Sequence, residues 1–172
     1  FGLVRKYKGL DIMIDALNKI DLDELKITPL IVGEFYTEKK PILEHINPKH
    51  RPKYHITDRF VSDEEASEYL TLANAMVLPY RTASQSGVLS NAINFNLPVI
   101  IPDLPGLTEH ITDNKTGLIF ETENAEALRK KIEVFARSGL YSEMTEHMEK
   151  LKKELTWSKF ARQLYRIIQE TS

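Results

Sequence analysis

Short apolar runs separated by polar segments recur along most of the chain, at two different periods. Six of these runs are rich in aliphatic or aromatic residues and are bounded by Gly, Pro or polar residues, which predicts buried strands. The strands are expected at Phe1–Val4, Pro29–Val32, Tyr54–Ile56 (or as far as Val61), Ala75–Leu78, Pro98–Ile101 and Leu118–Phe120.

Between these runs, apolar residues recur at helical spacing. Leu10, Met13, Ile14 and Leu17 share one face of a predicted helix. Ser62 and Glu65 have the spacing of a capping box, which predicts a helix reaching about Ala73. Further helices are expected at Glu38–Ile46, Gly87–Phe95, Leu107–Ile111, Ala125–Phe135, Tyr141–Leu151 and from Thr156 onward, with Phe160, Leu164, Ile167 and Ile168 inward.

This alternation predicts an α/β fold: a doubly wound, Rossmann-like parallel sheet of about six strands, with helices on both faces and a helical C-terminus. We find no repeat and no linker, so residues 1–172 are expected to form one domain. The chain opens at Phe1 within a predicted strand, without an initiating Met or a signal-peptide pattern, and we expect a fragment cut at a domain boundary.

Composition narrows the class of protein. Hydrophobic residues make up 42% of the 172 positions and the formal net charge is −2, which leaves no broad basic field for nucleic acid or an anionic membrane. There are no cysteines, which excludes disulfides, and the five histidines form no i, i+4 pair, so no metal site is expected. No apolar run approaches the roughly 20 residues of a membrane-spanning helix.

Two loops at predicted carboxyl ends of strands carry candidate binding residues, and ligands of open parallel sheets bind at those ends. Arg5–Gly9 has three cations in four residues at a helix start, which suits an anion; a solvated basic turn is the alternative, and Lys6 is expected to face solvent. Tyr80–Gly87 offers hydroxyls and a glycine for phosphate oxygens and sugar hydroxyls, although capping by Ser84 or Ser86 would explain one serine.

A third loop, Asp103–Glu109, contains a Pro-Gly turn, and Glu109 is expected in the first turn of the next helix, where the helix dipole explains it. Several catalytic and nucleotide-binding motifs are absent. The sequence has no G-x-G-x-x-G after the first strand, no P-loop, no nucleophile elbow and no H-E-x-x-H, which disfavours nicotinamide, flavin and common hydrolase chemistry.

In order and spacing, these pieces resemble the C-terminal domain of group 1 retaining glycosyltransferases of the GT-B fold. The segments that carry the resemblance are Phe1–Gly9 with its Gly-x5-Lys-Gly turn, Pro29–Glu34, Val61–Glu65, Ala73–Tyr80, Asn96–Ile100, Gly106–Glu109 and Gly117–Ile119. The resemblance implies that Lys8 binds the donor diphosphate. At the position where the family most often has an Arg, this chain has Leu3. Arg5 is therefore expected to be the second cation that binds the diphosphate, assisted by Ser86 and Gly87.

The same resemblance assigns the donor sugar and ribose to Gln85, Val88 and Asn91, and places the base beside Arg59, Phe60 and Val61. The family's E-x7-E element aligns with Ala83 and Asn91, so both of its carboxylates are replaced. An Asn side chain can still donate to and accept from ribose hydroxyls.

The implied activity is a metal-independent hexosyl transfer from a nucleoside diphosphate sugar, with retention, in cell-surface polysaccharide biosynthesis. No cofactor is expected. The partners would be the nucleotide-sugar and an N-terminal acceptor-binding domain of the same protein, through which any membrane contact would run. The location would be cytoplasmic, at the inner face of the membrane in the full-length protein, and the isolated fragment is expected to be inactive.

Two other functions remain open at this point. The missing carboxylates at Ala83 and Asn91 would also fit a catalytically inactive GT-B module used for binding or assembly. A nucleotide-sugar epimerase of GT-B architecture would need acid/base residues at the cleft, where Glu109 and His110 are the nearby candidates. A receiver-like module is disfavoured because the acidic cluster expected after the first strand is missing.

Overall fold

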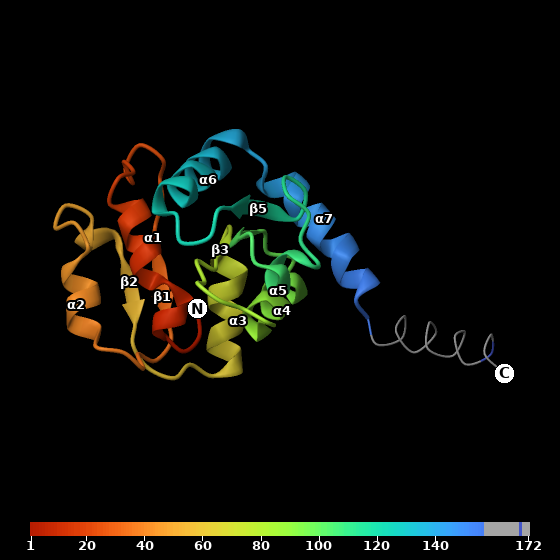
Figure 1. Ribbon diagram of the computed structural model, residues 1–172, viewed down its shortest axis with the longest axis horizontal. Coiled ribbons are helices and arrows are strands. Elements are labelled where there is room, and N and C mark those ends of the chain that lie inside the picture. The colour runs from red at the N-terminus through yellow and green to blue at the C-terminus, as the bar shows by residue number, and fades with distance from the viewer. Residues whose placement is uncertain (157–168, 170–172) are drawn as a thin grey trace.

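The computed structural model describes residues 1–156 and residue 169. The expected final helix, with Phe160, Leu164, Ile167 and Ile168, lies outside these residues. Strands and helices alternate along the described part of the chain, and every strand pairing in it is parallel, as the α/β prediction required (Figure 1).

The strands form two parallel sheets rather than one continuous sheet. In the first, β1 (Leu30–Val32) pairs with β2 (His55–Thr57). In the second, the order is β3 (Met76–Val77), β4 (Val99–Pro102) and β5 (Gly117–Phe120). The described residues therefore hold five strands in two sheets, not the single sheet of about six that the sequence predicted.

The difference lies at the N-terminus. Phe1–Val4 was expected to be a strand, but it makes only an isolated parallel bridge between Val4 and Phe35. Gly2 donates its amide to the Val32 carbonyl at 2.9 Å, so the segment does run beside the end of β1. It does not continue as a strand because Gly2 has a φ of 83°, which turns the chain out of the extended conformation.

The helices connect these strands. They are α1 (Leu10–Leu17), α2 (Lys39–Glu44), α3 (Asp63–Leu72), α4 (Gly87–Asn94), α5 (Pro105–Thr108), α6 (Ala125–Ser138) and α7 (Tyr141–Glu154), with short 3-10 turns at Lys6–Lys8 and Arg51–Lys53. Most of these bounds lie within two residues of the expected ones, and the C-terminal ends of α5, α6 and α7 differ by slightly more. Because Pro105 starts α5, Glu109 falls at the C-terminal cap of that helix and not in its first turn, which corrects the sequence prediction.

Helices cover both faces of the strands, as the predicted doubly wound arrangement requires. Consecutive residues of β4 alternate between two cores: Ile100 packs with α1 and α6, whereas Val99 and Ile101 pack with α3, α4 and α7. All three side chains are buried, so β4 reads as a continuous apolar run, which is typical of a central parallel strand.

The predicted capping box at the start of α3 is present. The Ser62 hydroxyl accepts from the Glu65 amide at 3.3 Å, and the Glu65 carboxylate accepts from the Ser62 amide at 3.2 Å. Arg59 also donates two hydrogen bonds to Glu65, and these bonds, together with the Ser62 amide, lower the pKa of Glu65 to about 2. The segment before α3 is thereby fixed to the helix start, and β2 ends at Thr57 rather than continuing to Val61.

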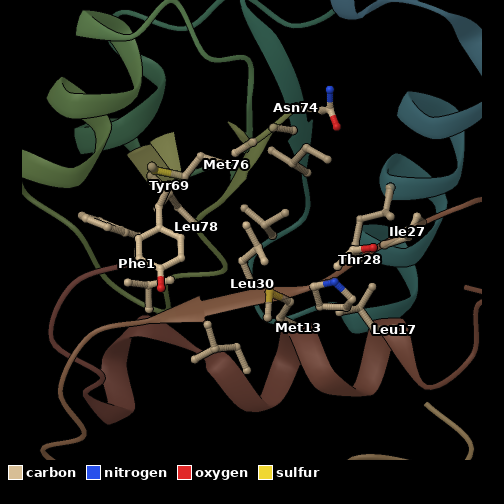
Figure 2. Close-up of a pocket in the computed structure, with 18 of the residues that line it drawn as sticks. Phe1, Met13, Leu17, Ile27, Thr28, Leu30, Tyr69, Asn74, Met76 and Leu78 are labelled. Carbon is tan, nitrogen blue, oxygen red and sulfur yellow. The ribbon is translucent and has the colours of Figure 1, made fainter. Parts of the chain in front are cut away.

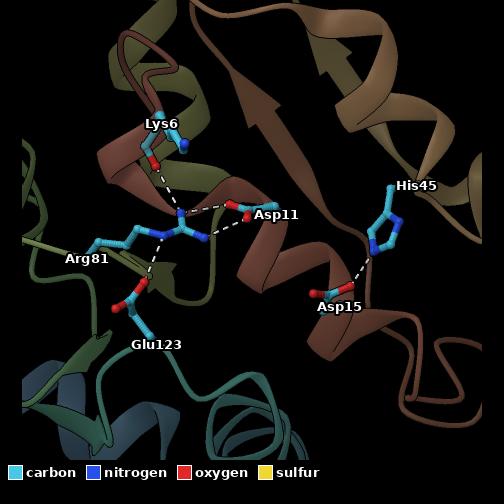
Figure 3. A network of polar contacts seen from close by, with 6 residues as sticks. All are labelled: Lys6, Asp11, Asp15, His45, Arg81 and Glu123. Carbon is cyan, nitrogen blue, oxygen red and sulfur yellow. Dashed lines mark hydrogen bonds and ion pairs between the residues drawn. The ribbon is translucent and has the colours of Figure 1, made fainter.

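An ion-pair network joins the first loop to two later parts of the chain (Figure 3). The Arg81 guanidinium donates to both carboxylate oxygens of Asp11, at 2.9 and 2.6 Å, and to Glu123 at 3.0 Å. A further bond reaches the Lys6 carbonyl at 3.0 Å. Because Asp11 lies in the first turn of α1, one side chain ties that helix to the segments that follow β3 and β5.

We predict that Asp11→Asn destabilises the protein in a pH-dependent way. The hydrogen bonds from Arg81 lower the pKa of Asp11, so the charged carboxylate is stabilised by folding. Its contribution is present above the ordinary pKa of about 4 and is lost as the pH falls through the lower, folded-state value. The difference in melting temperature between wild type and Asp11→Asn should therefore shrink as the pH is lowered from about 6 to 2.

The control is the same substitution in an Arg81→Met background. If Arg81 causes the shift, Asp11→Asn should have a much smaller and nearly pH-independent effect there, because the charge partner has been removed. A pH dependence of equal size in both backgrounds would contradict the assignment to Arg81.

Candidate functional site

Two of the loops singled out from the sequence meet at the carboxyl edge of the strands. The Arg81 amide donates to the Tyr7 carbonyl at 2.8 Å, and the Tyr7 and Tyr80 rings lie edge to face with centroids 5.9 Å apart. Gly9 permits this approach. It has a φ of 65°, and a Cβ at this position would lie 1.9 Å from the Pro79 carbonyl oxygen. The loop Arg5–Gly9 is thus packed directly on the segment that follows β3.

The third loop also reaches this edge. A Cβ on Gly106 would lie 2.5 Å from the carbonyl oxygens of both Ala83 and Ser84, so the start of α5 lies against the backbone of the loop Tyr80–Ser86. Asp103 fixes the other side of this turn, because its carboxylate accepts from the Thr122 amide at 2.8 Å and from the Thr122 hydroxyl at 2.5 Å. These two bonds stabilise the charged form of Asp103 and so lower its pKa.

Lys8 is the half-buried cation of the first loop. Its ammonium lies 5.7 Å from the centroid of the Tyr80 ring, and Nζ makes a long contact of 3.4 Å with the Phe1 carbonyl oxygen. Burial lowers the pKa of Lys8, and the nearby charge of Arg5 lowers it further. Within the described residues no carboxylate is paired with it, so its positive charge can be used to bind an anion.

Beneath Lys8, the Tyr80 side chain is buried. Its hydroxyl makes no hydrogen bond of ordinary geometry within the described chain, although Ser86 lies close enough to offset part of the shift in its pKa. Burial is the larger effect and raises the pKa of Tyr80. Tyr80 was not singled out from the sequence as a partner of Lys8, because a cation–ring contact between residues far apart in the chain leaves no signal in spacing.

Arg5, which is expected from the sequence to bind the diphosphate, contacts an aromatic ring instead. It is exposed, and its guanidinium lies over the Tyr36 ring, 5.4 Å from the centroid. Lys6 is exposed, as the sequence indicated, and its carbonyl is held by Arg81. Lys8 is the least exposed of the three cations in this loop.

The start of α4 forms the second half of the candidate site. Ser86 caps the helix: its hydroxyl accepts from the Leu89 amide at 3.2 Å, and its carbonyl accepts from the Ser90 amide at 3.1 Å. The amides of Gly87 and Val88 have no acceptor in the described part of the chain, as is usual for the first turn of a helix. A Cβ at Gly87 would meet nothing within 4 Å, so the space beside this residue is open.

Lys8 and the first turn of α4 are neighbours. The position that a Cβ of Gly2 would occupy lies 3.1 Å from Lys8 Nζ and 3.5 Å from Val88 Cγ2. The ammonium group of Lys8 therefore lies near the first turn of α4, whose first two amides are free. Charge, amide donors and helix dipole all favour an anion at this point.

The remaining residues named from the sequence are at the surface. Gln85, just before α4, and Asn91, within it, are exposed, and Val88 in the first turn is partly buried. Arg59 is engaged by Glu65, Phe60 is 77% exposed and Val61 is partly buried. Glu109 and His110 are exposed beyond α5.

Neither a metal-binding cluster nor a membrane-spanning helix is present among the described residues. No group of three or more His, Cys, Asp or Glu side chains in this part of the chain is arranged to hold a metal ion. None of the helices described is both long and apolar enough to cross a bilayer.

Known proteins resemble this chain in sequence. A sequence model of the family described as "Glycosyl transferases group 1" matches residues 1–137. An uncharacterized glycosyltransferase of Methanocaldococcus jannaschii is 27% identical over 166 residues, which cover 96% of this chain and 45% of that protein. The chain thus spans less than half the length of this relative.

Solved structures resemble it in fold. The C-terminal domain of LpcC, a glycosyl transferase group 1 family protein from Francisella tularensis, superimposes with a TM-score of 0.78 at 18% identity, covering 90% of this chain and 83% of that one. Anabaena HepE, solved in complex with UDP, gives a TM-score of 0.77 at 11% identity, covering 98% of this chain and 48% of that one. At these identities the likeness shows the fold. The family match, over most of the length, shows that the chain belongs to the group 1 glycosyl transferases.

Proposed function

We propose that residues 1–172 form the donor-binding domain of a retaining GT-B glycosyltransferase, which transfers a sugar from a nucleoside diphosphate sugar. The observation that carries this proposal is the half-buried ammonium of Lys8 near the Val88 side chain, in the first turn of α4, where the amides of Gly87 and Val88 are free. A diphosphate is the group of the donor that such a site suits. The UDP complex of the structurally similar Anabaena protein supports this choice of ligand class.

The chemistry follows from where charge develops. As the bond between the sugar and the diphosphate breaks, negative charge builds on the leaving phosphate. Lys8 and the amides of Gly87 and Val88 would stabilise that charge, and the Ser86 cap holds the helix start in place. Arg5 would have to leave the Tyr36 ring to add a second cation, which its exposed position allows.

The sugar and ribose would lie along α4. Gln85, Val88 and Asn91 occupy the loop and the first turns of this helix, and the exposed Asn91 amide can both donate to and accept from ribose hydroxyls. Arg59, Phe60 and Val61 precede α3 and would flank the base, where the exposed Phe60 ring offers a stacking surface. No metal or cofactor takes part in this proposal.

The acceptor would be bound by another domain of the longer protein, because the chain covers 45% of its M. jannaschii relative. We place the reaction in the cytoplasm, at the inner face of the membrane, in polysaccharide assembly at the cell surface. Residues 1–172 alone would then bind the donor without transferring its sugar.

We predict that Lys8→Ala weakens binding of UDP and GDP by about 10- to 100-fold, because a charge-assisted contact to the diphosphate is lost. Isothermal titration calorimetry measures this directly. Lys6→Ala is the matched control: it removes one positive charge from the same loop, but its side chain is exposed and the contact to Arg81 uses its backbone carbonyl. Equal effects of the two substitutions would show that only the general charge of the loop matters.

We predict that Asn91→Ala weakens UDP binding by about 3- to 10-fold through loss of a hydrogen bond to the ribose. The substitution should have no effect on binding of 2′,3′-dideoxy-UDP, which lacks the hydroxyls concerned. Asn94→Ala, another exposed position in α4, serves as the control. A loss of the same size for both nucleotides would place Asn91 elsewhere in the site.

The replaced carboxylates at Ala83 and Asn91 favour one other function, that of a GT-B module which binds a nucleotide-sugar without transferring the sugar. Turnover of UDP- and GDP-sugars by the full-length protein separates the two. We expect release of nucleoside diphosphate that requires an acceptor and is reduced at least 100-fold by Lys8→Ala. Donor binding without turnover would support the binding module. Release of nucleoside diphosphate without any acceptor would support a hydrolase, and conversion of the nucleotide-sugar to its epimer would support an epimerase.

A further inference from the structure

Three cations in the described part of the chain lie over aromatic rings, and their surroundings differ. Arg5 lies 5.4 Å from the centroid of the Tyr36 ring, but this side chain is 57% exposed, so water screens the contact. Lys39 lies 5.7 Å from the Phe35 centroid, and its ammonium is also paired with Asp58 at 2.6 Å. Neither of these two cations therefore depends on a buried ring for its stabilisation.

The contact between Lys8 and Tyr80 differs in both respects. The Tyr80 side chain is only 4% exposed, and its ring centroid lies 5.7 Å from the Lys8 ammonium. No carboxylate of the described residues is paired with Lys8, and the nearby charge of Arg5 repels it. A half-buried ammonium group in these surroundings needs a stabilising partner, and the electron-rich face of the ring supplies one.

The Tyr80 ring is held in place from more than one side. It contacts the Tyr7 ring edge to face, with centroids 5.9 Å apart and planes at 76°, which fixes it to the first loop. It also belongs to the buried cluster that contains Leu89 of α4. Its hydroxyl lies close to Ser86, the cap of the same helix. The ring therefore connects the loop that carries Lys8 with the start of α4.

An aromatic ring and a carboxylate differ as partners of a cation that has to bind a ligand. A carboxylate would neutralise the ammonium and compete with an incoming anion for its hydrogen bonds. A ring has no net charge, so it stabilises the ammonium and leaves its whole positive charge for the ligand. A buried ring beside Lys8 is thus the kind of partner that a diphosphate site requires.

We propose that Tyr80 is a positioning residue of the donor site, whose ring holds the charged Lys8 ammonium near the first turn of α4 for the donor diphosphate. This role rests on the proposed function, which supplies the diphosphate. Tyr80 acts through Lys8 and not by touching the donor, because its own side chain is buried. The effect depends on the charge distribution of the ring, whereas a role in packing alone would depend only on its shape.

The test replaces Tyr80 by phenylalanine and by phenylalanines that carry one, two and three ring fluorines. Tyr80→Phe keeps the ring and is the reference. Each added fluorine withdraws electron density from the ring face and weakens its attraction for a cation, while the shape of the ring changes little. Equal melting temperatures along the series would show that the packing is unchanged.

The titration of Lys8 checks the contact without any donor. Because the ring favours the charged ammonium, each added fluorine should lower the pKa of Lys8 further below its ordinary value. The NMR signal of the Lys8 ε-carbon, followed against pH, measures this, with the exposed Lys6 as internal reference. Of the described residues, Arg5, Tyr7 and the amino group of Phe1 are the other titratable groups near Lys8 or the ring, and they are the same in every variant.

Binding of UDP and GDP, measured by calorimetry, checks the role in the donor site. A weaker ring leaves a smaller fraction of Lys8 charged and in place, and the apparent affinity falls with that fraction. Along the series the affinity at pH 9 should fall stepwise by about 3- to 10-fold, and by less at pH 7, where the ammonium keeps its proton more readily. The same series in a Lys8→Met background is the matched control, and its affinity should be constant.

The two measurements separate this role from the proposed function. If no protein of the series, wild type included, binds UDP or GDP while the pKa of Lys8 still falls with fluorination, the ring holds the ammonium as described and the proposed function is wrong. A constant pKa of Lys8 along the series would overturn the role of Tyr80. So would a constant affinity in a series that binds UDP, or an equal loss of affinity in the Lys8→Met background.

Discussion

The close contact between the first loop and the end of β3 is the constraint on which the candidate site depends. Gly9 lies against the Pro79 carbonyl, and Arg81, two residues further on, holds Asp11 and the Lys6 backbone. With the loop fixed at both ends, Lys8 has little choice of position, and its ammonium lies over the Tyr80 ring. A side chain larger than hydrogen at Gly9 would force these segments apart.

The arrangement explains how a chain with a net charge of −2 can bind an anion. A general basic surface is not needed when one ammonium group is half-buried, without a carboxylate partner in the described structure, beside a helix N-terminus. Three arginines named for the site or its surroundings are occupied differently: Arg5 lies over Tyr36, Arg59 bonds Glu65 and Arg81 bonds Asp11. The ammonium that would bind the diphosphate and the structural ion pairs are thus supplied by different side chains.

The division of the strands into two sheets leaves a cavity of about 920 Å³ between them. Most of the side chains labelled on its wall are apolar, among them Leu30 of β1, Met76 and Leu78 of β3, and Met13 and Leu17 of α1 (Figure 2). Each sheet is therefore held by its own parallel ladder, and contacts between the sheets are made by side chains and by the helices that cover them.

Several features were decided by the sequence alone. Buried strands such as Val99–Ile101, the capping box at Ser62 and Glu65, and the starts of α3 and α4 follow from local patterns, because periodicity and capping act over a few residues. The family could be recognised for the same reason, from short motifs in a fixed order. Tertiary structure decided the rest. It set the division into two sheets, the turn at Gly2, the contact of Arg5 with Tyr36 and the approach of Lys8 to α4. These features depend on contacts between residues that are far apart along the chain, and no local spacing encodes such contacts.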